Sequence, residues 1–145
     1  MATGDVVFFE EAKDVAFFGG WATTDDIKCA VLDNTATPTA AWATPTLGDF
    51  TQVTAAGTYT TGGTSLGNWG TLSVEAAGTL TFDSTTNPTW AQDASNDVDA
   101  WWGLLYNDTA AGDDAFAFVE LGGPVDMSAG SLTITWHANG IFTIV

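Results

Sequence analysis

Residues 98–107 read VDAWWGLLYN, and residues 114–121 read DAFAFVEL. Both segments are apolar at consecutive positions, so an extended chain here carries hydrophobic side chains on both faces. This pattern is typical of a central strand that is covered on both sides. The residues between them, NDTAAGD at 107–113, are of the kinds that favour turns. We therefore predict two buried strands joined by a turn.

Shorter strand patterns precede this pair. Residues 26–33 alternate apolar and polar positions, and residues 69–75 and 78–83 do so on either side of a turn at 76–78. One face of the first of these strands carries Ile27, Cys29 and Val31. Cys29 is the only cysteine, and we interpret it as a small buried apolar residue.

A similar pattern ends the sequence. Leu132, Ile134 and Trp136 alternate with serine and threonine, and the motif HANG at 137–140 follows. Asn-Gly between two alternating runs predicts a hairpin into residues 141–145. Several short strands with frequent turns, together with 24 threonines, predict an all-β fold, an antiparallel β-sandwich of jelly-roll type.

Two regions depart from the strand pattern. Residues 5–18 have apolar positions at helical spacing and predict a short helix, with an extended N-terminal arm as the alternative. Residues 34–68 form a long stretch rich in Thr, Ala, Gly and Pro. Its aromatic residues indicate a loop that is ordered by packing. We expect one domain over 1–145, with the arm or helix in 1–20.

The charge is strongly one-sided. Asp and Glu number 18, while Lys and Arg together number 2, which gives a formal net charge of −16. Nucleic acids and anionic membranes are bound through Lys and Arg, so this composition excludes both as expected partners. A partner should be neutral or basic where it touches the chain. The acidity fits either a surface that resists premature association or adaptation to high salt.

The sequence begins without the basic and apolar regions of a secretory signal, and no segment reaches the ~18 apolar residues of a membrane span. We expect synthesis in the cytoplasm of a host cell.

Motifs for catalysis are sparse. His137 is the single histidine and lies in a predicted turn, and no Gly-x-Ser-x-Gly motif precedes it. One histidine and one cysteine are too few for a typical zinc site, and no phosphate-binding glycine motif is present. We expect no enzymatic activity and no catalytic residues.

Calcium is the one cofactor that the composition suggests. Asp93, Asn96, Asp97 and Asp99 cluster in one predicted loop, and oxygen ligands of this kind suit Ca²⁺. The EF-hand spacing fails, since Val98 stands where a glycine is needed. The alternative is a set of solvated turn residues.

Five segments, in this order, resemble a family of small, poorly characterised proteins that are encoded among the structural genes of tailed bacteriophages. They are GTYTTGGTSL at 57–66, PTW at 88–90, WGLLYNDT at 102–109, AFVELGG at 117–123 and GSLTITWHANGIFT at 130–143. The resemblance does not extend to residues 101–102, where this chain has two tryptophans in place of charged residues.

The resemblance implies a virion component. The function that we expect is a capsid decoration or cement protein, which docks as a homo-oligomer, in our expectation a trimer, on the shell of the major capsid protein. Its location would be the capsid surface. Two alternatives stay open: a tail or head-fibre component, and a Ca²⁺-dependent carbohydrate-binding module. Candidate contact residues are the aromatics of the N-terminal region, the long loop and the central strand. They are Phe8, Phe9, Phe17, Phe18, Trp42, Phe50, Trp101 and Trp102.

Overall fold

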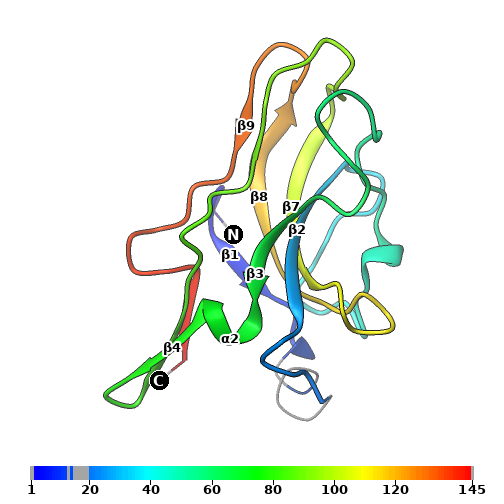
Figure 1. Ribbon diagram of the computed structural model, residues 1–145. Helices are drawn as coiled ribbons and strands as arrows, with labels where there is room; N and C mark the ends of the chain where they lie inside the picture. Colours follow the sequence, from blue (N-terminus) through cyan, green and yellow to red (C-terminus); the bar gives the residue numbers. More distant parts are fainter. Residues whose placement is uncertain (1, 13, 15–19, 145) are drawn as a thin grey trace.

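The computed structural model describes residues 2–12, 14 and 20–144, and it confirms an all-β, sandwich-like fold with antiparallel sheets (Figure 1). The strands and short helices follow in this order: β1 (Val6–Phe8), β2 (Asp26–Leu32), η1 (Leu47–Asp49), β3 (Thr64–Asn68), α2 (Trp69–Leu72), β4 (Ser73–Ala76), β5 (Thr79–Phe82), β6 (Thr89–Trp90), β7 (Ala100–Asn107), β8 (Ala115–Val125), β9 (Leu132–Thr133) and β10 (Phe142–Ile144). Among the described residues, no helix is long and apolar enough to cross a bilayer.

The first layer is a five-stranded sheet in the order β1-β8-β7-β2-β3. The strands predicted from 98–107 and 114–121 are β7 and β8, and they pair directly, with Gly103 opposite Val119. A side chain at Gly103 would collide with the second layer, because a Cβ there would lie 2.8 Å from Cδ1 of Ile134. Gly103 therefore lets the two layers approach closely at the centre of the sandwich.

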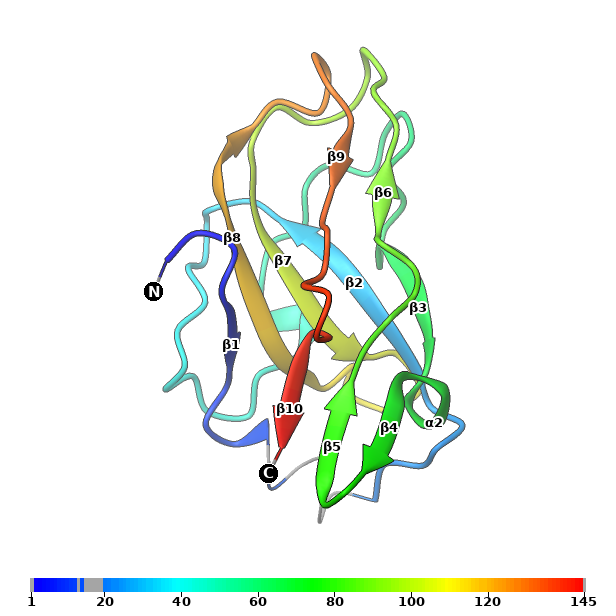
Figure 2. The same ribbon diagram turned by 90° about the vertical axis from the view of Figure 1, so that its left-hand side faces the viewer.

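The second layer is built from two long segments, 79–90 and 132–144. Their lower parts, together with β4, form a sheet in the order β10-β5-β4, and their upper parts form the pair β6-β9. Both lie in front of the larger sheet (Figure 2). The register differs by two residues between the two pairings, since Phe82 lies opposite Phe142 and Trp90 lies opposite Leu132. The segments are thus one antiparallel ribbon, interrupted in the middle.

The hairpin predicted at 137–140 is wrong. The turn itself is present, because the N–H of Gly140 donates to the carbonyl of His137 at 2.9 Å. However, β9 and β10 do not pair with each other; both pair with the segment 79–90. The turn makes a local irregularity in the ribbon and does not reverse the chain into a paired strand.

The loop predicted over 34–68 ends at residue 63, because Thr64–Asn68 form β3. Part of it lies on the outer face of the five-stranded sheet, where Phe50 packs on Phe9, and part reaches Trp90 of β6 through Tyr59. The loop reaches the edge of β8, where Thr46 bridges Asp114, and returns to the edge of β2, where Leu32 bridges Gln52. The Tyr59 hydroxyl donates to Oε1 of Gln52 at 2.8 Å and accepts the N–H of Val31 at 3.2 Å. The long loop is therefore ordered by contacts within the chain.

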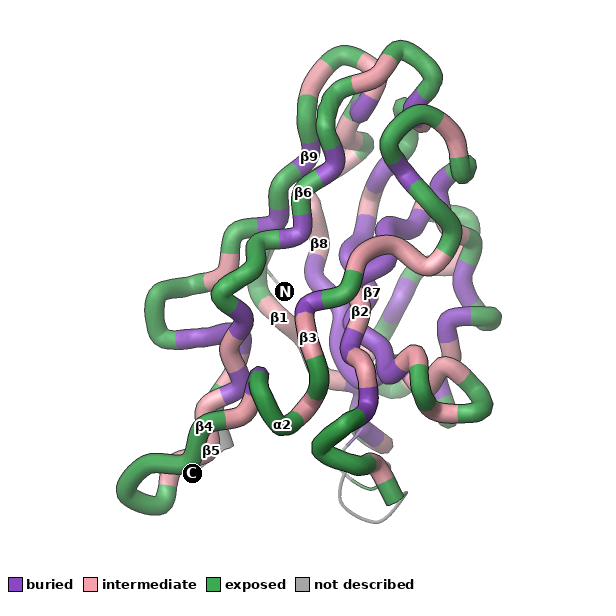
Figure 3. Tube along the Cα trace, in the orientation of Figure 1, coloured by how far each residue is buried: buried purple, intermediate pink, exposed green. Residues whose placement is uncertain are grey.

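The distribution of buried residues agrees with this arrangement of sheets and loop. Strands β2 and β7 are buried along most of their length and β8 is buried over residues 115–119, whereas most of β4 and the turn that follows it are exposed (Figure 3). Ile27, Cys29 and Val31 share one face of β2, as predicted, and all three are buried. Burial raises the pKa of the Cys29 thiol to about 12, so it is an unreactive core residue.

Two elements differ from the sequence-based expectation. Residues 69–72, predicted as part of a strand, form the single turn α2, because the side chain of Asn68 accepts the N–H of Thr71 and caps it. The strand of this region is β4, which starts at Ser73.

The predicted N-terminal helix is wrong over β1, which pairs with β8. Phe8 lies between the layers against Phe142, and Phe9 lies on the opposite face against Phe118. Two adjacent aromatics that need opposite faces favour a strand, not a helix. Residues 13 and 15–18 of the predicted helix lie outside the described residues.

Candidate docking groove

The aromatic contact candidates mostly serve the core. Phe9, Phe50 and Trp102 are buried, which corrects their expected role as surface contacts. They join Phe118 in one cluster under the long loop, with ring centroids 5.0 Å apart for Phe9–Phe118 and 6.1 Å for Phe9–Phe50 and for Trp102–Phe118. Trp42 is half-buried and packs on Phe50 at 4.9 Å.

Two more candidates are half-buried. Phe8 lies edge-on against Phe142 between the layers, at 4.4 Å. The indole N–H of Trp101 donates to the carboxylate of Asp99 at 2.6 Å. Phe17 and Phe18 lie outside the described residues. Internal packing thus accounts for most of the aromatic side chains that were candidates for contact with a partner.

The predicted calcium ligands are used in building loops. Asp97 accepts the backbone N–H groups of Thr54 at 2.7 Å and Val98 at 2.8 Å, and these bonds lower its pKa, the one from Thr54 most. Asp93 accepts the N–H of Ser95 at 2.8 Å. Within the described part of the chain, no three acidic, histidine or cysteine side chains gather as a metal site would require.

Asn96 is buried, and its side chain holds neighbouring loops together. Its side-chain oxygen accepts the N–H of Thr58 at 2.8 Å, and its amide donates to the carbonyls of Ala91 at 2.9 Å and Met127 at 3.2 Å. Three loops are therefore joined through one amide group. Gly57 makes room for it, since a Cβ at this position would lie 2.4 Å from the Asn96 oxygen.

The residues that could do acid–base chemistry lie apart. His137 is exposed, and its Nδ1 accepts the N–H of Asn139 at 3.1 Å within its own turn. Lys28 pairs with Asp108 at 2.7 Å on the other side of the sheet. Asp113 has a raised pKa, through partial burial and then the neighbouring charge of Asp108. Among the described residues, His137 and the Lys28–Asp108 pair thus do not share a site.

A groove lies between the two layers, on the side of β1 and β9. One pocket of about 210 Å³ lies between β8 and the segment that begins with β9. A second of about 300 Å³ adjoins it, and both are lined by Gly4, Thr135 and Trp136. We call this pair of pockets the seam groove. Its further lining residues are Thr3, Asp5, Val6, Val119, Glu120, Leu121, Leu132, Thr133, Ile134, His137, Gly140 and Ile141.

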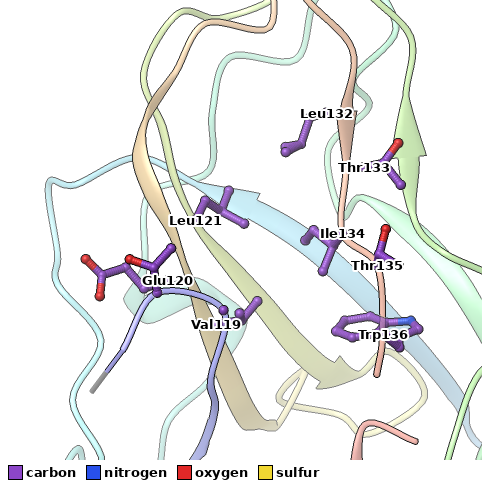
Figure 4. Close-up of a pocket in the computed structure, with 10 residues that line it drawn as sticks. Val119, Glu120, Leu121, Leu132, Thr133, Ile134, Thr135 and Trp136 are labelled. Atoms are coloured by element: carbon purple, nitrogen blue, oxygen red, sulfur yellow. The ribbon is translucent and has the colours of Figure 1, made fainter. Parts of the chain in front are cut away.

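The seam groove has a mixed lining, with apolar side chains between β8 and residues 132–134 and polar groups around them. Val119 and Leu121 of β8 face Leu132 and Ile134 across the space, while Glu120 points away from it (Figure 4). Leu132 and Ile134 are buried, whereas the threonines that alternate with them are exposed. The inside of the groove therefore suits apolar side chains.

Trp136 is fixed at the junction of the two pockets. Its indole N–H donates to the carbonyl of Thr86 at 3.1 Å, and its backbone N–H donates to the Asn87 side chain at 3.2 Å. The ring is half-buried and lines both pockets. A held aromatic ring gives an incoming group a rigid apolar surface.

Sequence reasoning did not identify the seam groove. The alternation at 132–136 correctly assigns the inward and outward residues, but the open side depends on which strands lie next to each other. A scan against protein-family models found no match, and neither did searches of curated proteins and of solved structures.

Proposed function

We propose that this chain is a non-catalytic structural protein of a tailed-bacteriophage particle, which docks on the shell of major capsid protein as a decoration or cement protein. The ordered motifs of the sequence resemble proteins of that kind. The observation that carries the proposal is the open seam groove of a β-sandwich whose chain has a net charge of −16. Such a molecule has a place to bind a neighbour and no assembled catalytic group among its described residues.

The mechanism is stabilisation by binding. A protein that binds the assembled shell and not its separated subunits shifts the equilibrium toward the shell. Many copies on one particle add their contributions, and copies joined as trimers bind with the further advantage of effective concentration. The acidic surface favours a neutral or basic docking site on the shell.

The test is quantitative mass spectrometry of purified particles produced by a culture that carries the gene. The expected result is a copy number close to that of the major capsid protein. A few copies per particle would assign the chain to the tail or head fibre. Absence from particles would contradict both assignments, and binding to a glycan array would then favour the carbohydrate-binding alternative.

The trimer is tested on the same particles. Chemical cross-linking followed by gel analysis should give a species of three times the 15.1 kDa chain mass. A species that contains one copy linked only to capsid protein would contradict the trimer and leave the docking proposal intact.

A further inference from the structure

The outer side of β9 is a free strand edge. β9 pairs with β6 on one side, and among the described residues no strand pairs with its other side. The N–H of Ile134 donates to the carbonyl of Pro88 at 3.0 Å, which directs its backbone toward β6. Because backbone groups alternate along a strand, those of Thr133 and Thr135 point the other way. No backbone hydrogen bond to Thr135 occurs in the described part of the chain.

This free edge lies beside the apolar part of the seam groove. A strand added at Thr133 and Thr135 would project every second side chain into the groove, toward Val119, Leu121 and Trp136. The other side chains would project outward over the acidic surface. Strand addition takes its affinity from backbone hydrogen bonds and its selectivity from pockets for alternate side chains.

The negative charge of the chain distinguishes between the partners that could bind in the seam groove. A second copy of the chain would bring another net charge of −16, and Asp5 lies at the mouth of the groove. Among the described residues Lys28 is the single lysine or arginine, and it is paired with Asp108. The surface therefore repels an acidic segment and attracts one that carries Lys or Arg.

We infer that the seam groove binds an extended segment of a partner protein, in which apolar residues alternate with Lys or Arg, as an added strand along Thr133 and Thr135. This inference rests on the proposed function, in which the partner is the major capsid protein. The segment would extend the β9 side of the second layer and close the sandwich where it is open.

The first experiment uses two synthetic peptides of alternating composition, one of valine and lysine and one of valine and glutamate. The expected result is binding of the lysine peptide alone, with the amides of Thr133 and Thr135 protected from hydrogen exchange in NMR spectra. Binding of both peptides, binding of neither, or binding without protection of these amides would overturn the inference. Saturable binding of an oligosaccharide at Trp136 would also overturn it, in favour of a carbohydrate site.

The matched variants are Thr135→Pro and Thr135→Ala. Proline removes the N–H that the added strand needs, while alanine keeps it and removes only an exposed side chain. We expect Thr135→Pro to weaken peptide binding at least tenfold and Thr135→Ala to leave it unchanged. If Thr135→Pro fails to fold, the pair Leu121→Arg and Leu121→Ala provides the same test. Arginine places a positive charge in the groove, which repels the lysine peptide, whereas alanine adds no charge. Equal binding by both members of a pair would contradict the inference.

Capsid shells from a phage that lacks the gene separate this inference from the proposed function. Wild-type chain and Thr135→Pro are added to the shells, and bound copies are counted. Binding of the wild type alone supports both proposals. Equal binding of the two contradicts strand addition and leaves the docking function standing. Failure of the wild type to bind contradicts the docking function; the peptide experiment still tests the groove.

Discussion

The outer face of the five-stranded sheet and the seam between the two layers differ in how they are closed. The outer face is sealed by residues 42–52, in which Phe50 packs on Phe9, Thr46 bridges Asp114 just before β8 and Gln52 bridges Leu32 at the end of β2. The seam has a partly apolar lining but no covering segment among the described residues, and it leaves one side of β9 unpaired. The sealed face uses its aromatic residues for folding. The open seam keeps apolar surface and backbone groups available for binding.

The largest loss of stability should come from truncating a buried side chain under the sealed face. Phe9 is 0% exposed and contacts both Phe118 and Phe50. We expect Phe9→Ala to lower the free energy of unfolding by about 3–5 kcal/mol, because it leaves a cavity that the sheet cannot fill. Urea denaturation followed by circular dichroism measures this. Phe9→Leu keeps most of the volume and should lose less than about 1.5 kcal/mol. Equal losses would mean that the face is not tightly packed.

A smaller loss is expected at Asn96, where the sealed region depends on hydrogen bonds. Asn96→Ala leaves the N–H of Thr58 and the carbonyl of Met127 without their partner. The expected cost is about 1–3 kcal/mol, the usual cost of a buried polar group left unsatisfied. Gln92→Ala is the control, because Gln92 is exposed and makes a single bond to Ser128. Similar melting temperatures for the two variants would contradict the role of Asn96.

Truncation in the open seam should affect stability less than truncation of the sealed face. Leu121 is half-buried and lines the groove. We expect Leu121→Ala to cost about 1 kcal/mol, since only part of its side chain leaves water on folding. The same urea experiment measures it. A loss equal to that of Phe9→Ala would show that the seam is packed as firmly as the outer face.

The smallest effect concerns pH. The N–H groups that donate to Asp97, that of Thr54 first, hold its pKa below the ordinary value of 3.8. Its contribution to stability is therefore complete above that value, and it is lost as the pH falls through the lower folded-state pKa. Amide exchange at Thr54 should accelerate below about pH 4 in the wild type. In Asp97→Asn the rate, corrected for the intrinsic pH dependence of exchange, should show no such step.

The strands with strong patterns were predictable from sequence. β2, β5 and β7 fall within the expected ranges, because consecutive or alternating apolar residues indicate their burial. β8 starts within its expected range of 114–121 and extends beyond it to Val125. The turn α2 was missed although its cap, Asn68, was visible, because the apolar alternation at 72 and 74 favoured a strand. Local patterns identified the segments and most of their inward residues.

Neighbour relations were not predictable in the same way. The Asn-Gly turn at 139–140 is real, but the pairing of β9 and β10 with 79–90 depends on the whole ribbon. The aromatic residues Phe9, Phe50 and Trp102 have the composition of an interface, and only the path of the long loop shows that they are covered. The seam groove is likewise a product of which strand edges remain free.

The pairing of β1 with β8 has a consequence for how the chain acquires its fold. Val6 lies opposite Val119, and Phe82 of the second layer lies opposite Phe142. A ribosome must therefore release most of the sequence before the first strand meets its neighbour. Folds dominated by such distant pairings close on the scale of about milliseconds to seconds, far more slowly than helical bundles. Until then β1 has no β8 beside it, and the nascent chain exposes to its surroundings a strand that is paired in the finished molecule.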